Sequence, residues 1–486
     1  MEKKTYFAFV YNNLKRRIAK GQFLPGHKLP SAKSLCEEYH VGIYTITRVL
    51  EALKAEGMIE TRPRQAPIVL NSAEVSEKSE INAILAERDS ILQVYQTFAL
   101  LMPILLTFSS QGLELEVMEH YDQAIKVARR GVTAGGWKVL ASLDMDILKS
   151  SGNPLFCSLY SIFEMNCSLT FFAEQCDFFK ENYTCKKITV PGQVIDILRR
   201  NDPYKKYCQL KAVYQELYQT VSETFKHLES NVAECPDQVD IPFDWNPFRK
   251  DYNYMRIVRD LILKIGRGEY PKGTFLPFEA QLAKQYGVSV YTVRKALDLL
   301  EVRGYTKTLN AKGTQVLLPD DSHISTALSN LVIRENALCY LYALQLMILL
   351  AHPVAECVVL RFSEEELNSL AEQFQEPNTL QFKTLFLAVR EHLDLKPLRS
   401  IFVETSKITD WGFYFIYCSW DSVTLTHLKS LALEAYRRLC RKDVTGFGES
   451  WANCYRFILD SVRAYMIEKY NFKGGNTVKT PELITY

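Results

Sequence analysis

Gly21-Gln-Phe-Leu-Pro-Gly-His-Lys-Leu-Pro30 recurs 247 positions later as Gly268-Glu-Tyr-Pro-Lys-Gly-Thr-Phe-Leu-Pro277. The repeat continues without a gap over residues 21–70 and 268–317, where 15 positions are identical. Many of the other apolar positions match in kind. An internal repeat determines the architecture before any local assignment, because each copy folds as the same structural unit. We therefore expect two copies of one small domain.

In each copy the apolar pattern predicts three helices followed by a β-hairpin. The helices of the first copy are expected at 6–20, 32–39 and 43–56, and its hairpin at 58–70. Ser31 is expected to cap the second helix, and Gly57 to end the third in a left-handed conformation. The second copy has its elements at 254–265, 278–286, 290–303 and 305–317, with Ser289 as a cap. This order of elements is a winged helix-turn-helix.

The two modules are basic, whereas the rest of the chain is acidic. Residues 1–70 carry a net charge of +6 and residues 248–317 carry +7, whereas the whole chain carries +2. The remaining residues therefore carry −11 (2 − 13). Basic modules joined to acidic domains are typical of nucleic-acid-binding proteins. The expected partner is double-stranded DNA.

The regions that follow the two modules are expected to be all-helical. Long amphipathic stretches occur there at 213–228 and 452–468, and alternating strand patterns are scarce. A diverged second repeat is indicated because four residues recur 241 positions later: Arg200, Asp202, Tyr214 and Val221 match Arg441, Asp443, Tyr455 and Val462. The predicted fold is mainly α, with winged domains at 1–72 and 248–318 and helical effector or dimerisation domains at 80–243 and 325–486.

Composition favours a cytoplasmic protein without membrane association. The most apolar stretches, 98–108 and 337–351, are shorter than the roughly 20 residues that span a bilayer, so we interpret them as core helices. The N-terminal residues do not resemble a signal peptide. The twelve cysteines form no Cys-x-x-Cys pair, which favours free thiols in a reducing compartment.

The repeated string resembles the GntR family of bacterial transcription regulators. It reads Gly-x-aromatic-x-x-Gly-x-x-Leu-Pro, then a Leu six residues after that Leu, then Val-x-x-x-Thr-Val/Ile, and a Gly after the helix. The resemblance covers about 65–70 residues of each copy. It implies DNA-binding regulators with arginines on the recognition helix and a basic residue at the start of the preceding helix. It also implies a helical partner domain that often binds a small organic acid.

The expected reading face is the first turns of each third helix, which enter the major groove, while the wing holds phosphates. In copy one the expected DNA-binding residues are Lys33, Tyr44, Thr45, Thr47, Arg48, Arg62 and Arg64. In copy two they are Ser289, Tyr291, Thr292, Arg294, Lys295, Lys312 and Gly313. The position after the turn, commonly Arg in the family, is Ile43 and Val290, and an apolar side chain there can contact a thymine methyl. Alternatively, the tyrosines and threonines only stabilise the turn.

The helical regions are expected to bind an effector without a metal or other cofactor. Related regulators sometimes hold a metal through an Asp and three His, but no Asp-x-x-x-His occurs in either helical region. The aromatic-rich stretches 163–179 and 411–420 either line an effector pocket or belong to the core. Catalytic residues are not expected, because neither region has the length or the Gly-rich phosphate turn of the pyridoxal-phosphate domain found in some family members.

Sequence alone therefore favours an effector-controlled transcription regulator that is not an enzyme. The alternative is a protein-interaction module with weak or lost DNA binding. Ordinary family members are homodimers that read a palindrome with half-sites about 10 base pairs apart. This chain carries two unlike recognition helices, so we expect it to act as a pseudo-dimer on unlike half-sites, with a homodimer as the other arrangement.

Overall fold

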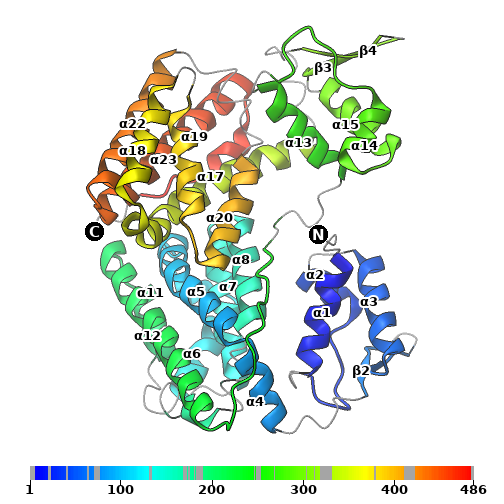
Figure 1. Cartoon of the computed structure of the whole chain (residues 1–486). Helices are drawn as coiled ribbons and strands as arrows, with labels where there is room; N and C mark the ends of the chain where they lie inside the picture. The colour runs from blue at the N-terminus through cyan, green and yellow to red at the C-terminus, as the bar shows by residue number, and fades with distance from the viewer. Residues whose placement is uncertain are drawn as a thin grey trace. The chain divides into compact units, whose positions relative to one another are not determined.

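The chain forms two compact units, one of residues 1–150 and 157–250, the other of residues 151–156 and 251–486. Each unit contains one winged module and one helical region (Figure 1). The computed structural model describes residues 6–19, 23–39, 42–62, 65–70, 77–130, 134–167, 172, 176–179, 181, 190–245, 247, 253–266, 269–302, 304–310, 312–317, 331–376, 379–409 and 422–482.

The first winged module has the predicted helices and a short wing. It consists of α1 (Tyr6–Ala19), α2 (Ala32–Tyr39), α3 (Ile43–Ala55), β1 (Ile59–Glu60) and β2 (Ile68–Val69), with the strands antiparallel. The predicted caps are confirmed. The Oγ atom of Ser31 accepts a hydrogen bond from the Ser34 amide at 3.1 Å, and Gly57 has a φ of +73°. The core contains Val10, Leu14, Ile18, Leu35, Ile46, Leu50, Leu53 and Val69.

The second module repeats this arrangement with a longer wing. It consists of α13 (Asn253–Gly266), α14 (Glu279–Tyr286), α15 (Val290–Val302), β3 (Thr306–Leu309) and β4 (Gly313–Val316). The Oγ atom of Ser289 accepts from the Thr292 amide at 3.2 Å, which confirms the predicted cap. Helix α14 begins one residue later than predicted. Phe278 precedes the helix, and its amide donates to Gln281 Oε1 at 3.1 Å.

A hydrogen bond between the first and second helices is also repeated. In copy one the Tyr39 hydroxyl donates to Asn13 Oδ1 at 2.7 Å. At the equivalent positions of copy two, the Tyr286 hydroxyl donates to Asp260 Oδ2 at 2.5 Å, and Lys264 Nζ lies 2.8 Å from the same oxygen. Burial, together with the Asp260 carboxylate, raises the pKa of Tyr286. The duplication therefore preserves an interhelical contact as well as an apolar pattern.

The two helical regions are built on long helices. The first region contains α4 (Glu77–Ala86), α5 (Arg88–Ser109), η1 (Leu115–Val117), α6 (Tyr121–Arg130), α7 (Ala134–Ser150), α8 (Pro154–Cys167), α10 (Asp177–Phe179), α11 (Val190–Leu198) and α12 (Pro203–Ser230). The second contains α17 (Leu331–Val358), η3 (Val359–Arg361), α18 (Glu364–Gln375), α19 (Gln381–Glu391), α20 (Lys396–Thr409), α22 (Ser422–Cys440), α23 (Val444–Tyr470) and η5 (Lys473–Thr477).

Equivalent contacts support the second, diverged repeat. Helix α12 packs on α5, and α23 packs on α17. Asp202 caps α12 by accepting from the Lys205 amide at 3.0 Å, and Asp443 caps α23 by accepting from the Gly446 amide at 2.9 Å. An aspartate at this position satisfies amides that have no partner within the helix. The other matched residues on these helices are buried: Tyr214, Val221, Tyr455 and Val462.

Among the residues that the structure describes, two helices are long and apolar enough to cross a membrane by length and composition. They are α5 and the segment 337–361, and each continues through an internal proline. Within their most apolar windows, 72% and 83% of the residues are buried inside the structure. Burial to this extent is typical of core helices, as the sequence predicts.

Candidate nucleic-acid interface

The first turns of α3 and α15 are exposed and carry large apolar side chains. Tyr44 is 73% exposed and Tyr291 is 74% exposed, and both follow an exposed β-branched residue, Ile43 or Val290. The next apolar residue of α3, Ile46, is fully buried in the module's core. Each recognition helix therefore packs one face inward and presents its N-terminal turns outward.

In copy one, Arg48 stacks on aromatic rings. Its guanidinium carbon lies 5.0 Å from the ring centroid of Phe7 on α1 and 5.9 Å from that of Tyr44. Such cation–π contacts restrict a side chain while leaving its charge intact. Lys33 is exposed on the first turn of α2. Thr47 is also exposed, and its hydroxyl donates to the Ile43 carbonyl at 2.9 Å within the helix.

Copy two repeats the stacking with a lysine. Lys295 Nζ lies 4.2 Å from the ring centroid of Tyr254 on α13. Lys295 and Tyr254 occupy the positions of Arg48 and Phe7, 247 residues further along the chain. Sequence reasoning identified both cations but not the aromatic residues that hold them.

Arg294 forms an ion pair that has no counterpart in copy one. Its Nη2 atom lies 2.7 Å from Glu279 Oε2, and its Nε atom lies 3.2 Å from the same oxygen. The Glu279 side chain raises the pKa of Arg294. Copy one has Ala32 and Thr47 at these positions. Sequence reasoning did not identify Glu279, and the only signal was a carboxylate at the start of the preceding helix.

The two wings differ. In copy two, Lys312 is exposed and Gly313 has a φ of +104°, a conformation that favours glycine. A Cβ atom at Gly313 would lie 3.6 Å from the ring of Phe278. In copy one, Arg62 Nε pairs with Glu60 Oε1 at 2.9 Å, and Arg64 lies outside the described residues.

Of the two threonines that follow the tyrosines, Thr292 contacts the cap at the start of its helix. Thr45 and Thr292 are half-buried. Besides accepting from the Thr292 amide, the Oγ atom of Ser289 lies 2.8 Å from Thr292 Oγ1. For Thr292, these contacts favour the alternative in which the threonine stabilises the turn.

The described phenylalanines of the stretch 163–179 lie mostly in the core of the first helical region. Phe163, Phe172 and Phe179 are fully buried. The Phe172 ring lies 5.4 Å from that of Phe225 at a nearly perpendicular angle. The stretch 411–420, the other candidate for an effector pocket, lies outside the described residues.

Three potential metal ligands meet in the first helical region. The ligand atoms of Glu119, His120 and Asp146 all lie within 4.8 Å of one another. Asp146 Oδ2 is 2.8 Å from His120 Nδ1 and also accepts from the His120 amide at 3.1 Å. Asp146 thereby attaches the start of α6 to α7, which accounts for the cluster without an ion. Its residues are too far apart in sequence to form a recognisable motif.

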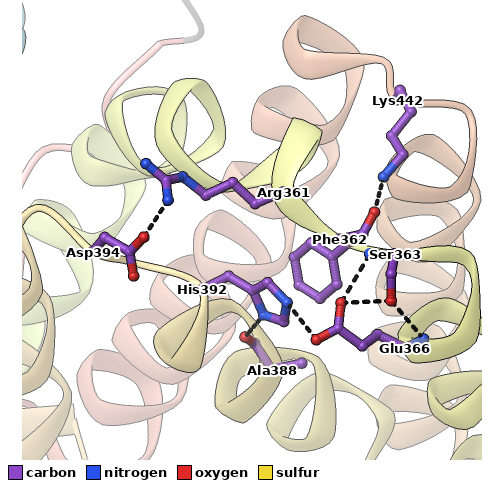
Figure 2. Close-up of polar contacts among 8 residues, drawn as sticks. All are labelled: Arg361, Phe362, Ser363, Glu366, Ala388, His392, Asp394 and Lys442. Atoms are coloured by element: carbon purple, nitrogen blue, oxygen red, sulfur yellow. Dashed lines mark hydrogen bonds and ion pairs between the residues drawn. The ribbon is translucent and has the colours of Figure 1, made fainter.

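A polar network joins α18 and α19 in the second helical region (Figure 2). His392 Nδ1 lies 2.9 Å from the Ala388 carbonyl oxygen, and His392 Nε2 lies 3.1 Å from Glu366 Oε1. Hydrogen bonds from the Ser363 amide and from His392 lower the pKa of Glu366 to about 2. The His392 ring also stacks on Phe362, with centroids 3.8 Å apart. The polar atoms of His392 and Glu366 are therefore bonded to neighbouring protein groups, so the network joins the two helices.

Residues 7–69 and 253–316 each match the family of bacterial regulatory proteins, gntR family. Both winged modules belong to the gntR family. The matched ranges begin in α1 and α13 and end at β2 and β4. The matched ranges therefore contain the two exposed recognition helices, α3 and α15.

Two curated relatives are bacterial regulators. The chain is 39% identical over 64 residues to the HTH-type transcriptional regulator TreR of Bacillus subtilis (strain 168), covering 13% of this chain and 27% of the relative. It is 20% identical over 210 residues to the HTH-type transcriptional repressor NanR of Enterobacter sp. (strain 638), covering 42% of this chain and 80% of the relative. The second match is longer than a gntR-family module.

Solved structures similar to this chain include Streptococcus agalactiae GntR, with 17% identity and a TM-score of 0.21. That match covers 44% of this chain and 99% of the other. The Escherichia coli protein McbR/YncC has 18% identity and a TM-score of 0.23, covering 46% of this chain and 99% of the other.

Proposed function

We propose that this chain is a transcription regulator that binds double-stranded DNA through both gntR-family modules. The observation that carries the proposal is the exposure of the first turns of α3 and α15, each with an aromatic tip and a stacked cation. Membership of the gntR family supports the functional class, as do curated relatives that are transcriptional regulators. In this proposal the chain has no catalytic activity and acts in the cytoplasm.

Phosphate and base contacts come from different residues in this proposal. Lys33, at the start of α2, and Lys312, in the second wing, contact phosphates and fix the position on the duplex. Arg48 and Lys295 extend from the recognition helices toward base edges. Ile43 and Val290 contact thymine methyl groups, which are the apolar features of the major groove.

We also propose that the helical regions bind a small effector without a metal. The absence of the Asp-x-x-x-His pattern from both regions of the sequence supports the metal-free part of this proposal. Asp146 in the cluster with Glu119 and His120 already joins α7 to the residue before α6 through its contacts with His120. Stoichiometric metal in purified protein would overturn this part of the proposal.

A protein-interaction module is the second candidate. Phe275 is 44% exposed and Phe278 is 65% exposed in copy two, where copy one has Lys28 and Ser31. Exposed aromatic residues are enriched at protein interfaces. This observation concerns copy two only.

A gel-shift assay against DNA upstream of the chain's own gene separates the two functions. Replacing both Arg294 and Lys295 by alanine should weaken binding by about 1–3 kcal/mol for each base that these side chains read. A matched control removes two exposed lysines from the helical regions, Lys226→Ala with Lys429→Ala. Unchanged affinity in the first double variant would remove copy two from the interface. Failure of the wild-type chain to shift DNA would favour the protein-interaction module.

A further inference from the structure

We infer that Glu279 is a positioning residue that holds Arg294 for reading a guanine in the half-site of copy two. The inference rests on the proposed function, because it requires α15 to enter the major groove. It concerns base preference, whereas the proposed function concerns DNA binding as such.

The geometry of the pair leaves one edge of the guanidinium available. Glu279 lies in the first turn of α14, and its carboxylate contacts the Nε and Nη2 atoms of Arg294. The Arg294 side chain nevertheless remains 59% exposed. A guanidinium has five N–H donors in one plane, so the donors on the Nη1 side remain for a second acceptor.

Guanine is the base that matches this second edge. Its N7 and O6 atoms present two acceptors in the major groove, which suits a planar fork of donors. A carboxylate that already fixes the plane of the guanidinium reduces the conformational entropy that base binding costs. Glu279 thereby gives Arg294 an orientation that Lys295, a flexible point charge, does not have.

The net charge of the Arg294–Glu279 pair predicts which measurement detects its contribution to DNA binding. Arg294 and Glu279 together carry no net charge, so contact through the pair adds little to counterion release. The contribution should therefore appear as base preference. Copy one has Ala32 and Thr47 at these positions, so the guanine preference should be restricted to one half-site.

The test is selection of bound sequences from a random DNA pool by the full chain and three variants. The wild-type chain should recover a guanine at a fixed position in one half-site, and Arg294→Ala should lose it. Glu279→Ala, which introduces the residue of copy one, should reduce the preference at that position by about tenfold. The same variant should bind non-specific DNA more tightly, and its salt dependence should steepen by about one unit of slope. Glu279→Gln retains one acceptor oxygen and should keep part of the preference.

Opposite changes in base preference and non-specific affinity distinguish positioning from a general structural role. An equal loss of affinity for all sequences in Glu279→Ala would overturn the assignment, because it would indicate damage to the module. An unchanged guanine preference in that variant would also overturn it. Failure of the wild-type chain to bind any duplex would instead overturn the proposed function.

Discussion

Raising the salt concentration from about 50 to about 200 mM should weaken binding of the chain to its operator by about 10³-fold or more. The reason is the net charge of +6 and +7 on the two modules. Exposed lysines of the two modules, including Lys28, Lys33 and Lys312, are available for phosphate contacts. About six phosphate contacts are enough to produce a change of this size.

Fluorescence anisotropy with a labelled duplex at several salt concentrations measures this effect. A neutral osmolyte at matched osmolarity is the control, and it should change affinity little. A slope of log Kd against log salt of only one or two would contradict the prediction. It would mean that few phosphates are contacted and would favour the protein-interaction module.

Replacing Asp144 by asparagine should remove a pH-dependent loss of stability from the first helical region. Burial raises the pKa of Asp144 to about 7, partly opposed by a hydrogen bond from the Tyr160 hydroxyl at 3.3 Å. The pKa in the unfolded chain is about 3.9, so the folded state binds an additional proton between these values. Stability therefore falls as pH rises from about 4 to about 7 and then stays low. Asp144 is only half-buried, so solvent screens part of this effect. We therefore expect a loss of about 2 kcal/mol in the free energy of unfolding, less than the full pKa shift would give.

Hydrogen exchange of peptides from α7 and α8, measured at pH 5 and pH 8 after correction for intrinsic rates, tests this prediction. The Asp144→Asn variant should be protected more than the wild-type chain at pH 8, and the difference should shrink at pH 5. Asp196→Asn, on α11, is a matched control because that side chain is 69% exposed. Equal pH dependence of this protection in the wild-type chain and in Asp144→Asn would contradict the prediction. It would show that ionisation of Asp144 does not destabilise the folded state.

The winged modules could be predicted from sequence because their determinants are local. Ser31 and Ser289 precede their helices, and Gly57 follows one, so the element boundaries are encoded within a few residues. Two independent copies confirmed the same spacing. The boundary of α14 was missed by one residue because Phe278 is apolar and continues the helical pattern.

The contacts around the reading face could not be predicted because they join separate elements. Arg48 and Phe7 are 41 residues apart, and Arg294 and Glu279 are 15 residues apart. Only the packing of the helices brings each pair together. The sequence pattern identified the cations of the recognition helices. It did not show that Arg48 and Lys295 stack on aromatic rings, or that Arg294 pairs with Glu279.

In the helical regions, too, only local features could be predicted from the sequence. Their weak repeat was detectable through Asp202 and Asp443, which occupy equivalent helix caps. The pair of His120 and Asp146 was not detectable, because Asp146 lies on α7 and is 26 residues away from His120, which precedes α6.

We propose that one chain supplies two unlike recognition helices, α3 and α15, to one operator. The most direct measurement is the mass of the complex with a selected operator, determined by light scattering together with the operator's sequence. The account predicts one chain bound per duplex and two unlike half-sites. A symmetric palindrome bound by two chains would contradict it, because each chain would then supply one active head and one structural module.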